Sequence, residues 1–507
     1  MWTGYSLKKK MPDTQGFWDR ARKASVEEVL ELIGRKYVDA VNPDSLNETA
    51  IDALVKELDP HSVYIPAEFT QEANEELKGH FEGIGVEYLI LDDTLHVVQV
   101  LPGGPSLKAG VQLGDRIIKV GDSIVAGKGI TGERIKKLLR GPSGTPVTVT
   151  IRRDTKDLTI TIIRGNVPRP AVDAAYLIDS TTAFLHINKF SSTTYEEMMK
   201  ALEELQQKGM KKLILDLRGN SGGLLEEAVD IADEFLDGNR MILYTEGQNS
   251  PREEYKCKRP GLFEKGPLVV LVDEFSASAS EVLAGALQDW DRATVIGRRT
   301  FGKGLVQQAF ELENGAELRL TVARYYTPTG RNIQKPYTAD HDAYESEIFL
   351  RYHHSTSADS PQAAPQKVFK TLEKKRTVYG GGGITPDITV PFDTASLGRP
   401  VSGLVASNML REFVYRFAVK EKHQWEKLPS AKALGRSFFL LPAQWQELIK
   451  TAARSGIDLQ NLSPLEQENL QQVFKEQLAL QLWGTEGFYE LSNETDAFVK
   501  QARSTLH

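Results

Sequence analysis

An apolar run, a helical pattern and a second apolar run follow one another from Leu268 to Ile296, and this order restricts the fold more than any other feature. Leu268 to Val272 is short and rich in β-branched residues, as expected of a buried strand. Apolar residues then recur at helical spacing from Ala279 to Leu287, and Ala293 to Ile296 is apolar again. A strand, a helix and a strand of these lengths form a parallel crossover. The chain is therefore expected to contain an α/β region with Ser278 at the turn where the helix begins.

The predicted position of Ser278 suits a nucleophile. The first amides of a helix, among them that of Ala279, have no intrahelical partner and stabilise nearby negative charge. A serine hydroxyl needs a base, and Lys303 is the candidate. Lysine accepts a proton only in its neutral form, which burial or neighbouring positive charge favours. The flanking Gly302 and Gly304 would let the lysine enter a tight site on a bent backbone.

Gln307 follows four residues after Lys303. If this segment is extended, side chains alternate and the two share a face, so Gln307 could orient the lysine amine. Each residue also has a plain structural interpretation: a serine before a helix is usually an N-cap, a Gly-Lys-Gly is usually a solvated turn, and a strand glutamine usually faces water. The combination of all three in one segment favours the catalytic interpretation.

Four segments resemble the signature of the C-terminal processing peptidases, the S41-type serine proteases that include the tail-specific proteases: Ser276 to Glu281, Gln288-Asp289, Thr300 to Gly304 and Val306-Gln307. In that family the central serine of S-A-S-A-S is the nucleophile, the lysine of F-G-K-G is the base and the following glutamine positions the lysine. The resemblance implies these roles for Ser278, Lys303 and Gln307, a serine and lysine variant of the triad. It also implies a crotonase-like (ClpP/crotonase-type) α/β protease domain.

A second motif is expected to complete an oxyanion hole. A predicted strand, Lys212 to Leu217, leads into Arg218 to Gly223 and then into a helical pattern. Glycines at a helix start let a substrate carbonyl approach the backbone, where each donor contributes about 3 to 4 kcal/mol. The family usually has proline where Ser221 stands, but the glycines remain, so the amides of Gly222 and Ala279 are expected to bind the oxyanion. The plain alternative is a glycine-rich turn of any α/β protein, without the dinucleotide fingerprint.

Residues 81 to 165 form a third pattern, short β-rich runs separated by glycine and proline turns, which predicts a small β domain. Three of its segments resemble a PDZ domain: Gly83 to Val86, Gly104 to Gly110 and Leu113 to Ile117. Such domains bind a peptide as an added strand and hold its carboxylate with loop amides. The resemblance implies this role for Gly83, Ile84, Gly85 and Val86. A helix over Gly132 to Leu139 is expected to line or close the groove, and an ordinary β-barrel is the alternative.

The chain is thus predicted to be an α/β protein with a helical region at 1–80, a PDZ domain at 81–166, a serine protease domain at 167–395 and a helical region at 396–507. Ser25 and Glu28 have capping-box spacing, which predicts a helix start in the first region. A polar insertion is expected near 335–375, where TSADSPQAAPQ occurs. In the last region, Ser463, Pro464 and Glu466 predict the start of a helix.

Composition excludes several classes of function. With 507 residues and 40% hydrophobic residues, the chain can form several packed cores. A net charge of -7 provides no broad basic field, so no nucleic acid partner is expected. The single Cys257 cannot form an internal disulfide, and no Cys or His cluster has metal-ligand spacing, so neither a metal nor another cofactor is expected. His61 and His186 are expected to be structural.

The hydropathy of the chain and its first residues bear on the cellular location of the protein. No apolar stretch reaches the roughly 18 residues of a membrane span, and residues 1–16 lack the apolar core of a signal peptide. Members of the family are typically exported, so the resemblance implies the periplasm or cell envelope, with the leader absent from this chain. A cytoplasmic location is the alternative.

These patterns together predict a serine endopeptidase that cleaves proteins near their C-termini, with the PDZ domain binding the substrate tail and regulating activity. The partners are proteins or peptides with flexible C-termini, and a homo-oligomer is left open. One alternative is an inactive PDZ scaffold, which the retention of Ser278, Lys303 and Gln307 disfavours. The other is a crotonase-type acyl-CoA enzyme, which the PDZ segments and Lys303 disfavour.

Overall fold

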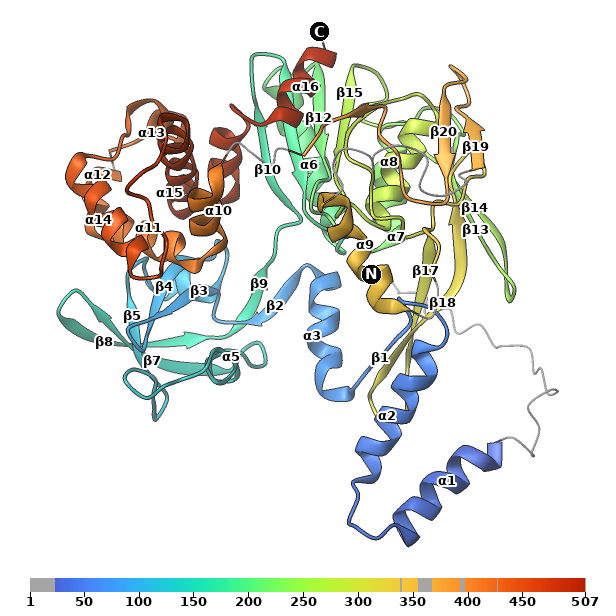
Figure 1. Ribbon diagram of the computed structural model, residues 1–507, viewed down its shortest axis with the longest axis horizontal. Helices are drawn as coiled ribbons and strands as arrows, with labels where there is room; N and C mark the ends of the chain where they lie inside the picture. Colours follow the sequence, from blue (N-terminus) through green and yellow to red (C-terminus); the bar gives the residue numbers. More distant parts are fainter. Residues whose placement is uncertain (1–22, 338–339, 354–366, 393–396, 426, 507) are drawn as a thin grey trace. The chain divides into compact units, whose positions relative to one another are not determined.

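The computed structural model describes residues 23–337, 340–353, 367–392, 397–425 and 427–506 (Figure 1). It contains two compact units, the first made of Met1–Thr70, Gln307–Thr321 and Tyr337–His341, and the second of Gln71–Val306, Val322–Pro336 and Asp342–His507. The predicted segment TSADSPQAAPQ, at residues 356–366, and the chain start at residues 1–16 lie outside the described residues.

The first unit contains two helices and a short strand: α1 (Lys23–Lys36), α2 (Pro43–Lys56) and β1 (Val63–Ile65). The predicted capping box at Ser25 is wrong, because Ser25 lies inside α1 and not before it. Asn42 caps α2, since its side chain accepts the amide hydrogen of Asp44 at 2.9 Å. A proline at the first helical position needs no hydrogen-bond acceptor there, so Pro43 favours this helix start.

Asp59 organises the segment that follows α2. Its carboxylate accepts hydrogen bonds from the amides of His61 and Ser62, and from the Ser62 hydroxyl at 2.7 Å. The Thr321 hydroxyl donates to it as well, at 3.1 Å. Burial acts to raise the pKa of Asp59, but these hydrogen bonds together hold it below its usual value. Asp59 therefore joins the end of the helical segment to strand β18 (Glu317–Tyr326), whose first residues pair antiparallel with β1.

In the second unit, the predicted small β domain is present as a six-stranded sheet. Its strands are β3 (Val86–Leu91), β4 (Thr94–Val100), β5 (Arg116–Val120), β6 (Ser123–Ile124), β7 (Pro146–Arg153) and β8 (Lys156–Ile163), with helices α4 (Pro105–Lys108) and α5 (Gly132–Leu139). The order β3-β4-β5-β7-β8 places β3 at an edge. Ile135 and Leu139 of α5 are buried in the core of this domain, beside Leu95 and Val97 of β4.

A second six-stranded sheet carries the α/β region. Its order is β10 (Val172–Leu177), β11 (Thr182–Ile187), β12 (Lys212–Asp216), β15 (Leu268–Val272), β16 (Thr294–Gly297) and β21 (Ile388–Thr389). Along the chain, α6 (Thr194–Gln207) follows β11, α7 (Leu225–Asp233) follows β12 and α8 (Ala279–Asp289) follows β15. β10 is antiparallel to β11, and the other pairs are parallel. The predicted strand, helix and parallel strand around Ser278 are thus confirmed as β15, α8 and β16.

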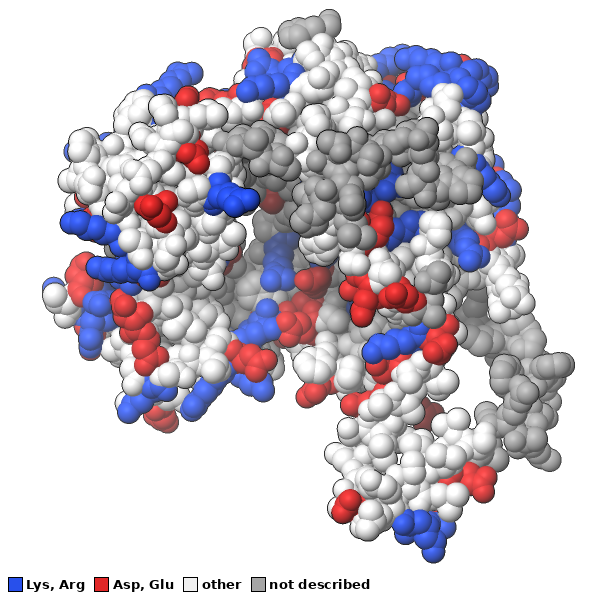
Figure 2. Space-filling model, in the orientation of Figure 1, with Lys and Arg blue, Asp and Glu red and all other residues white. Residues whose placement is uncertain are grey.

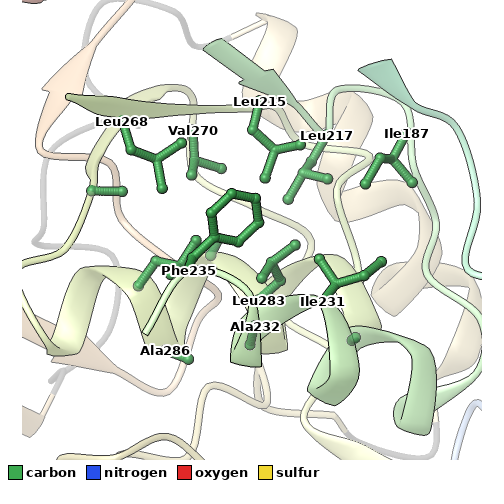
Figure 3. Close-up of a cluster of buried hydrophobic side chains, with 14 of the residues drawn as sticks. Ile187, Leu215, Leu217, Ile231, Ala232, Phe235, Leu268, Val270, Leu283 and Ala286 are labelled. Atoms are coloured by element: carbon green, nitrogen blue, oxygen red, sulfur yellow. The ribbon is translucent and has the colours of Figure 1, made fainter. Parts of the chain in front are cut away.

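Both faces of this sheet are covered, as expected of parallel strands. Figure 3 shows one side, where Phe235 lies between Leu215 and Val270 of the strands and Leu283 of α8. On the other face, helix α16 (Ala497–Thr505) packs Phe498 and neighbouring apolar residues against the strands. All five residues of β15 are buried.

The remaining elements surround these sheets. They are α3 (Ala67–Lys78), β2 (His80–Gly83), β9 (Gly165–Pro168), β13 (Met241–Gly247), β14 (Ser250–Lys256), β17 (Leu305–Glu311), α9 (His341–His353), β19 (Lys367–Lys370) and β20 (Thr377–Gly380). β2 and β9 pair antiparallel, so the chain enters and leaves the small β domain through adjacent strands. In the second unit, the last residues of β18 pair with β13.

Residues after 397 form helices with a core of their own. They are α10 (Gly398–Ala406), α11 (Asn408–Lys420), α12 (Lys422–Trp425), α13 (Ala431–Ser437), α14 (Pro442–Ala453), α15 (Pro464–Ser492) and α16. Buried aromatic residues, among them Phe417 and Phe474, pack edge to face at 5.3 Å between ring centroids. The predicted cap of α15 is confirmed, because the Ser463 hydroxyl accepts the amide hydrogen of Glu466.

Replacement of Phe235 by alanine tests the core of the α/β region. Phe235 is fully buried, so Phe235→Ala is expected to lower the free energy of unfolding by about 3 to 5 kcal/mol. Pulse proteolysis in urea would measure the change. Phe349→Ala is the control, since Phe349 is 62% exposed and its loss should change stability by less than about 0.5 kcal/mol. Equal effects of the two changes would contradict this description of the core.

Candidate active site

Ser278 occupies a strained turn at the start of α8. Its φ is +54° and its ψ is -113°, a conformation that costs a non-glycine residue on the order of 1 to 3 kcal/mol. The turn before it is held by the Asp273 carboxylate, which accepts the amide hydrogens of Phe275, Ser276 and Gly219. Strained turns between a strand and a helix present a nucleophile in other hydrolases. The backbone around Ser278 therefore has the form that such a role requires.

Glu281 joins the backbone of Ser278 to that of Lys303. Its buried carboxylate accepts the amide hydrogen of Ser278 at 2.9 Å and that of Lys303 at 2.8 Å. It also accepts hydrogen bonds from the Gly302 amide and the Thr300 hydroxyl. Burial raises the pKa of Glu281 to about 7, although these hydrogen bonds act in the opposite direction. One carboxylate thus holds the two predicted catalytic segments together.

Tyr325 makes a second connection between the same two residues. Its hydroxyl lies 3.2 Å from the carbonyl oxygen of Ser278 and also hydrogen-bonds the carbonyl oxygen of Lys303. The side chain is buried, so water does not compete for these contacts. The amides and the carbonyls of Ser278 and Lys303 are therefore both bridged by buried side chains, and the two segments lie side by side.

The glycines beside Lys303 have the expected geometry. Gly302 has a φ of +93°, and a Cβ atom there would lie 3.0 Å from the Cβ of Lys335. A Cβ on Gly304 would lie 2.8 Å from the amide nitrogen of Gln334. A larger residue at either position would displace the backbone that carries Lys303. Strand β17 begins at Leu305, so Lys303 precedes the strand instead of lying within it.

Gln307 belongs to the first unit, whereas Ser278 and Lys303 belong to the second. Its side-chain amide donates a hydrogen bond to the backbone carbonyl of His61. This contact gives the segment Leu58 to Ser62 a structural partner on β17. The proposed orientation of the lysine by Gln307 stays a prediction.

Gly222 lies directly against the nucleophile turn. Its φ is +98°, and a Cβ on it would lie 2.8 Å from the Cβ of Ser278 and 2.7 Å from the carbonyl oxygen of Ala277. However, the Gly222 amide donates to the side-chain oxygen of Asn220 at 2.8 Å. Binding of an oxyanion by this amide would replace that hydrogen bond, and the assignment of Gly222 to an oxyanion hole stays a prediction. Ala279, the other expected donor, provides the first amide of α8.

Asn220 is a residue that the sequence analysis did not single out. It is fully buried, and its backbone carbonyl accepts hydrogen bonds from the Ala277 amide at 3.0 Å and the Ser280 hydroxyl at 2.9 Å. Its side-chain nitrogen donates to the carbonyl oxygen of Ile187 at 2.8 Å. Asn220 thus joins the glycine-rich loop to the nucleophile turn. Glu281 had a usable signal, because it stands three residues after Ser278, the spacing of a capping box.

The start of the glycine-rich loop is anchored to α16. The Arg218 guanidinium pairs with Asp216 at 2.6 Å and with Asp496 at 2.8 Å, and it lies 4.7 Å from the ring centroid of Phe498. Asp496 also caps α16 by accepting the amide hydrogen of Val499. Burial acts to lower the pKa of Arg218, but the two carboxylates raise it. The C-terminal helix therefore contributes to the position of the loop that carries Gly222.

His186 has the structural role expected of it. Its Nδ1 lies 2.6 Å from an Asp173 oxygen, and its Nε2 lies 3.1 Å from the hydroxyl of Tyr489 on α15. Burial acts to lower the pKa of His186, but Asp173 and Asp216 raise it above its ordinary value. The histidine thus joins β10 and β11 to the C-terminal region.

The small β domain carries a cavity of about 820 Å³ at its edge strand. Ile84, Gly85 and Val86 of the predicted carboxylate loop line it, as does Leu139 of α5. Gly83 ends β2 and is not among the lining residues. Gly85 has a φ of +77°, and a Cβ there would lie 3.1 Å from the Cα of Gly104, so the loop requires glycine.

Three other kinds of functional feature are relevant to the described residues: charged patches, metal sites and membrane-spanning helices. On the face shown in Figure 2, basic and acidic side chains of the described residues lie interspersed. Among the residues that the structure describes, no group of three or more His, Cys, Asp or Glu side chains could hold a metal ion. Within the same residues, no helix has the length and apolar character needed to cross a bilayer.

Comparisons with known proteins identify the family of this chain. The family model for Peptidase family S41 matches residues 181–343, and the PDZ domain model matches residues 83–163. A carboxy-terminal-processing protease of Bartonella bacilliformis is 38% identical over 317 residues, which cover 61% of this chain and 71% of that protein. The chain belongs to peptidase family S41. It is a serine-type protease with a PDZ domain.

Two further proteins are similar to this family member. A probable CtpA-like serine protease of Staphylococcus epidermidis is 37% identical over 318 residues, covering 62% of this chain and 64% of that protein. The solved structure of a photosystem II D1 C-terminal processing protease is 26% identical, with a TM-score of 0.37, and covers 75% of this chain and 95% of that one.

Two glycines of one loop provide a matched test of the site. Gly222→Ala would force a Cβ against Ser278 and Ala277, and is expected to lower kcat/KM on casein by about 100-fold or more. Gly219→Ala is the control, because Gly219 also has a positive φ but has no atom within 4 Å of an added Cβ. Strain alone should affect both variants alike. Comparable activity of the two variants would contradict the placement of Gly222 beside the nucleophile.

Glu281 gives a prediction for the pH dependence of stability. Burial raises the pKa of Glu281 to about 7 in the folded protein, whereas its pKa in the unfolded chain is about 4.3. Between these two pH values the folded state therefore binds more protons than the unfolded state. The stability of the wild type relative to Glu281→Gln should therefore fall as pH rises from about 4.3 to 7, by on the order of 3 kcal/mol. It should be constant above pH 7. Thermal unfolding of both proteins from pH 5 to 8 would measure this, and parallel profiles would contradict it.

Proposed function

We propose that this protease cleaves substrate proteins near their C-termini, with Ser278 as nucleophile, Lys303 as general base and Gln307 as the residue that orients the lysine. The observation that carries the proposal is the pair of bridges made by Glu281 and Tyr325. They hold the backbones of Ser278 and Lys303 together in a buried setting. The name of one relative, carboxy-terminal-processing protease, supports cleavage near the C-terminus of the substrate.

The proposed reaction has two stages. The neutral Lys303 amine takes the hydroxyl proton of Ser278, whose oxygen attacks the scissile carbonyl carbon. The amide of Ala279 stabilises the resulting oxyanion, and the lysine ammonium returns the proton to the leaving amine. Lys303 then activates water, which hydrolyses the acyl-enzyme and releases Ser278. Gly222 serves as the second oxyanion donor once its hydrogen bond to Asn220 is exchanged for one to the substrate.

The PDZ domain is proposed to hold the substrate tail. Its edge strand β3 offers unpaired backbone groups, and the loop of Ile84, Gly85 and Val86 lies where a terminal carboxylate would be bound. A flexible tail can pair there as an added strand. Tail binding would also regulate cleavage if the tail has different affinities for active and resting arrangements.

Three further predictions stand beside this proposal. A crotonase-like arrangement fits the parallel sheet with α6, α7 and α8 in its crossovers. Export to the periplasm or cell envelope follows from family resemblance. Formation of a homo-oligomer stays a prediction.

Substitution of the two central residues tests the mechanism. Ser278→Ala and Lys303→Ala are each expected to lower kcat/KM on an unfolded casein by at least about 1000-fold, because nucleophile and base act as a unit. Lys265→Ala is the control for loss of a lysine, since Lys265 is exposed. Casein digestion followed by mass spectrometry would measure rates and cleavage positions. Normal cleavage by Ser278→Ala would contradict the proposal, as would cleavage without any preference for C-terminal regions.

A further inference from the structure

The lining of the cavity at the PDZ edge strand comes from distant parts of the chain: residues of the α/β region such as Asp173 and Lys189 contribute to it, besides the two walls described next. One wall is formed by the loop and start of β3, from Ile84 to Tyr88, together with Leu139. The other includes four consecutive residues of α15: Trp483, Gly484, Thr485 and Glu486. About 400 residues of sequence separate the two walls, and both belong to the second unit. The C-terminal region therefore takes part in the groove that the PDZ fold alone would leave open.

A break in α15 places these four residues at the groove. Gly484 has a φ of +69° and a ψ of -162°, which interrupts the helix. Only glycine adopts such angles without a steric penalty. A Cβ on Gly484 would lie 3.9 Å from the side-chain nitrogen of Gln99, a residue of β4 that also lines the cavity. The broken turn thus lies close to the PDZ sheet.

The C-terminal region is fastened to the PDZ domain beside this turn. The pairing of β3 with β4 shifts between Glu87 and Tyr88, and this bulge leaves Val98 without a partner in the ladder. Gln481, two residues before Trp483, donates its side-chain amide hydrogen to the carbonyl oxygen of Val98. A hydrogen bond from α15 therefore satisfies a backbone group that the bulge frees.

Side chains of α11 add contacts around the same sheet. Arg411 pairs with Glu87 of β3 at 3.2 Å, and Arg416 pairs with Asp92 at 2.8 Å. The Tyr415 hydroxyl lies 3.1 Å from Nδ1 of His96. Because these contacts and Gln481 act on both β3 and β4, the broken turn is held at a defined position beside the groove.

The chemistry of the two walls suits the end of a protein chain. Apolar side chains line part of the cavity, and Trp483 adds a large aromatic surface to them. Charged residues of both signs line the rest, among them Glu76, Asp173 and Lys189. Two guanidinium groups, those of Arg140 and Arg169, lie over the ring of Phe81 at 5.0 and 5.4 Å, and all three residues belong to the lining. Arg140 also pairs with Glu75 at 2.6 Å. A tail with an apolar terminal side chain and a free carboxylate matches this combination.

We infer that the broken turn of α15 forms the second wall of the tail-binding groove, and that Trp483 is a specificity-determining residue that packs on an apolar side chain of the substrate tail. The inference rests on the proposed function, in which the PDZ domain binds the tail. Its consequence is that the tail is read jointly by the PDZ loop and the C-terminal region. Trp483 acts in binding and not in the chemistry at Ser278.

The binding test uses the full chain with Ser278→Ala, which prevents cleavage. The probe is a fluorescein-labelled ten-residue peptide that ends in leucine with a free carboxylate, and anisotropy measures its Kd. Adding Trp483→Ala should raise Kd by about 10-fold or more, as expected for a buried aromatic anchor, and Trp483→Phe should restore part of the affinity. Trp445→Ala is the matched control, because both tryptophans pack at the margin of the same helical core but Trp445 does not line the cavity. Its Kd should change by less than about twofold.

Cross-linking gives a second measurement that does not depend on a folded variant. A benzophenone residue next to the terminal leucine should attach to the tryptic fragment 476–500, which contains Trp483, and an excess of unlabelled peptide should prevent this. An unchanged Kd for Trp483→Ala, or labelling confined to other fragments, would overturn the inference while tail binding stands. Tighter binding by Trp483→Ala would also overturn it, because the turn would then obstruct the groove.

Different experimental results would contradict the proposed function itself. If the parent protein does not bind the peptide, or binds an amidated version equally well, the PDZ domain does not recognise a free tail. The proposed role of the PDZ domain is then wrong, and the inference falls with it. Binding by the parent with no effect at Trp483 removes the inference alone.

Discussion

The active-site arrangement depends on one buried carboxylate. Glu281 would be costly to bury if its oxygens lacked partners, and the donors that satisfy it come from both predicted catalytic segments. The burial of this group therefore requires Ser278 and Lys303 to lie side by side. The same contact helps to hold Ser278 at a positive φ, which the free chain would not favour. Tyr325 adds the matching restraint on the carbonyl side.

The C-terminal region is part of the protease body and not a separate appendage. Asp496 pairs with Arg218 at the start of the glycine-rich loop, and Tyr489 hydrogen-bonds His186 on β11. Earlier in the same helix, Gln481 and Trp483 reach the PDZ domain. A single stretch of chain therefore contacts both the cavity at the PDZ edge strand and the supports of the glycine-rich loop that carries Gly222.

Local patterns predicted local structure well where one signal dominated. The strand, helix and strand around Ser278 followed from apolar spacing, and the start of α15 followed from Ser463 and its capping acid. The capping box at Ser25 failed because serine and glutamate at this spacing also occur within helices, as they do in α1. Glu281 stood in a quoted motif, but its partners at Lys303 could be found only in the folded chain.

The sequence by itself determined the crossover that carries Ser278, the glycines that its neighbours require, and membership of a protease family with a PDZ domain. Only the tertiary structure decided which donor meets which acceptor: the Gly222 amide is held by Asn220, and Trp483 reaches a groove built from residues far earlier in the chain. The physical reason is the distance along the chain over which each kind of interaction acts. Spacing of apolar residues fixes periodicity over one element, whereas hydrogen bonds between distant segments depend on how several elements pack together at once.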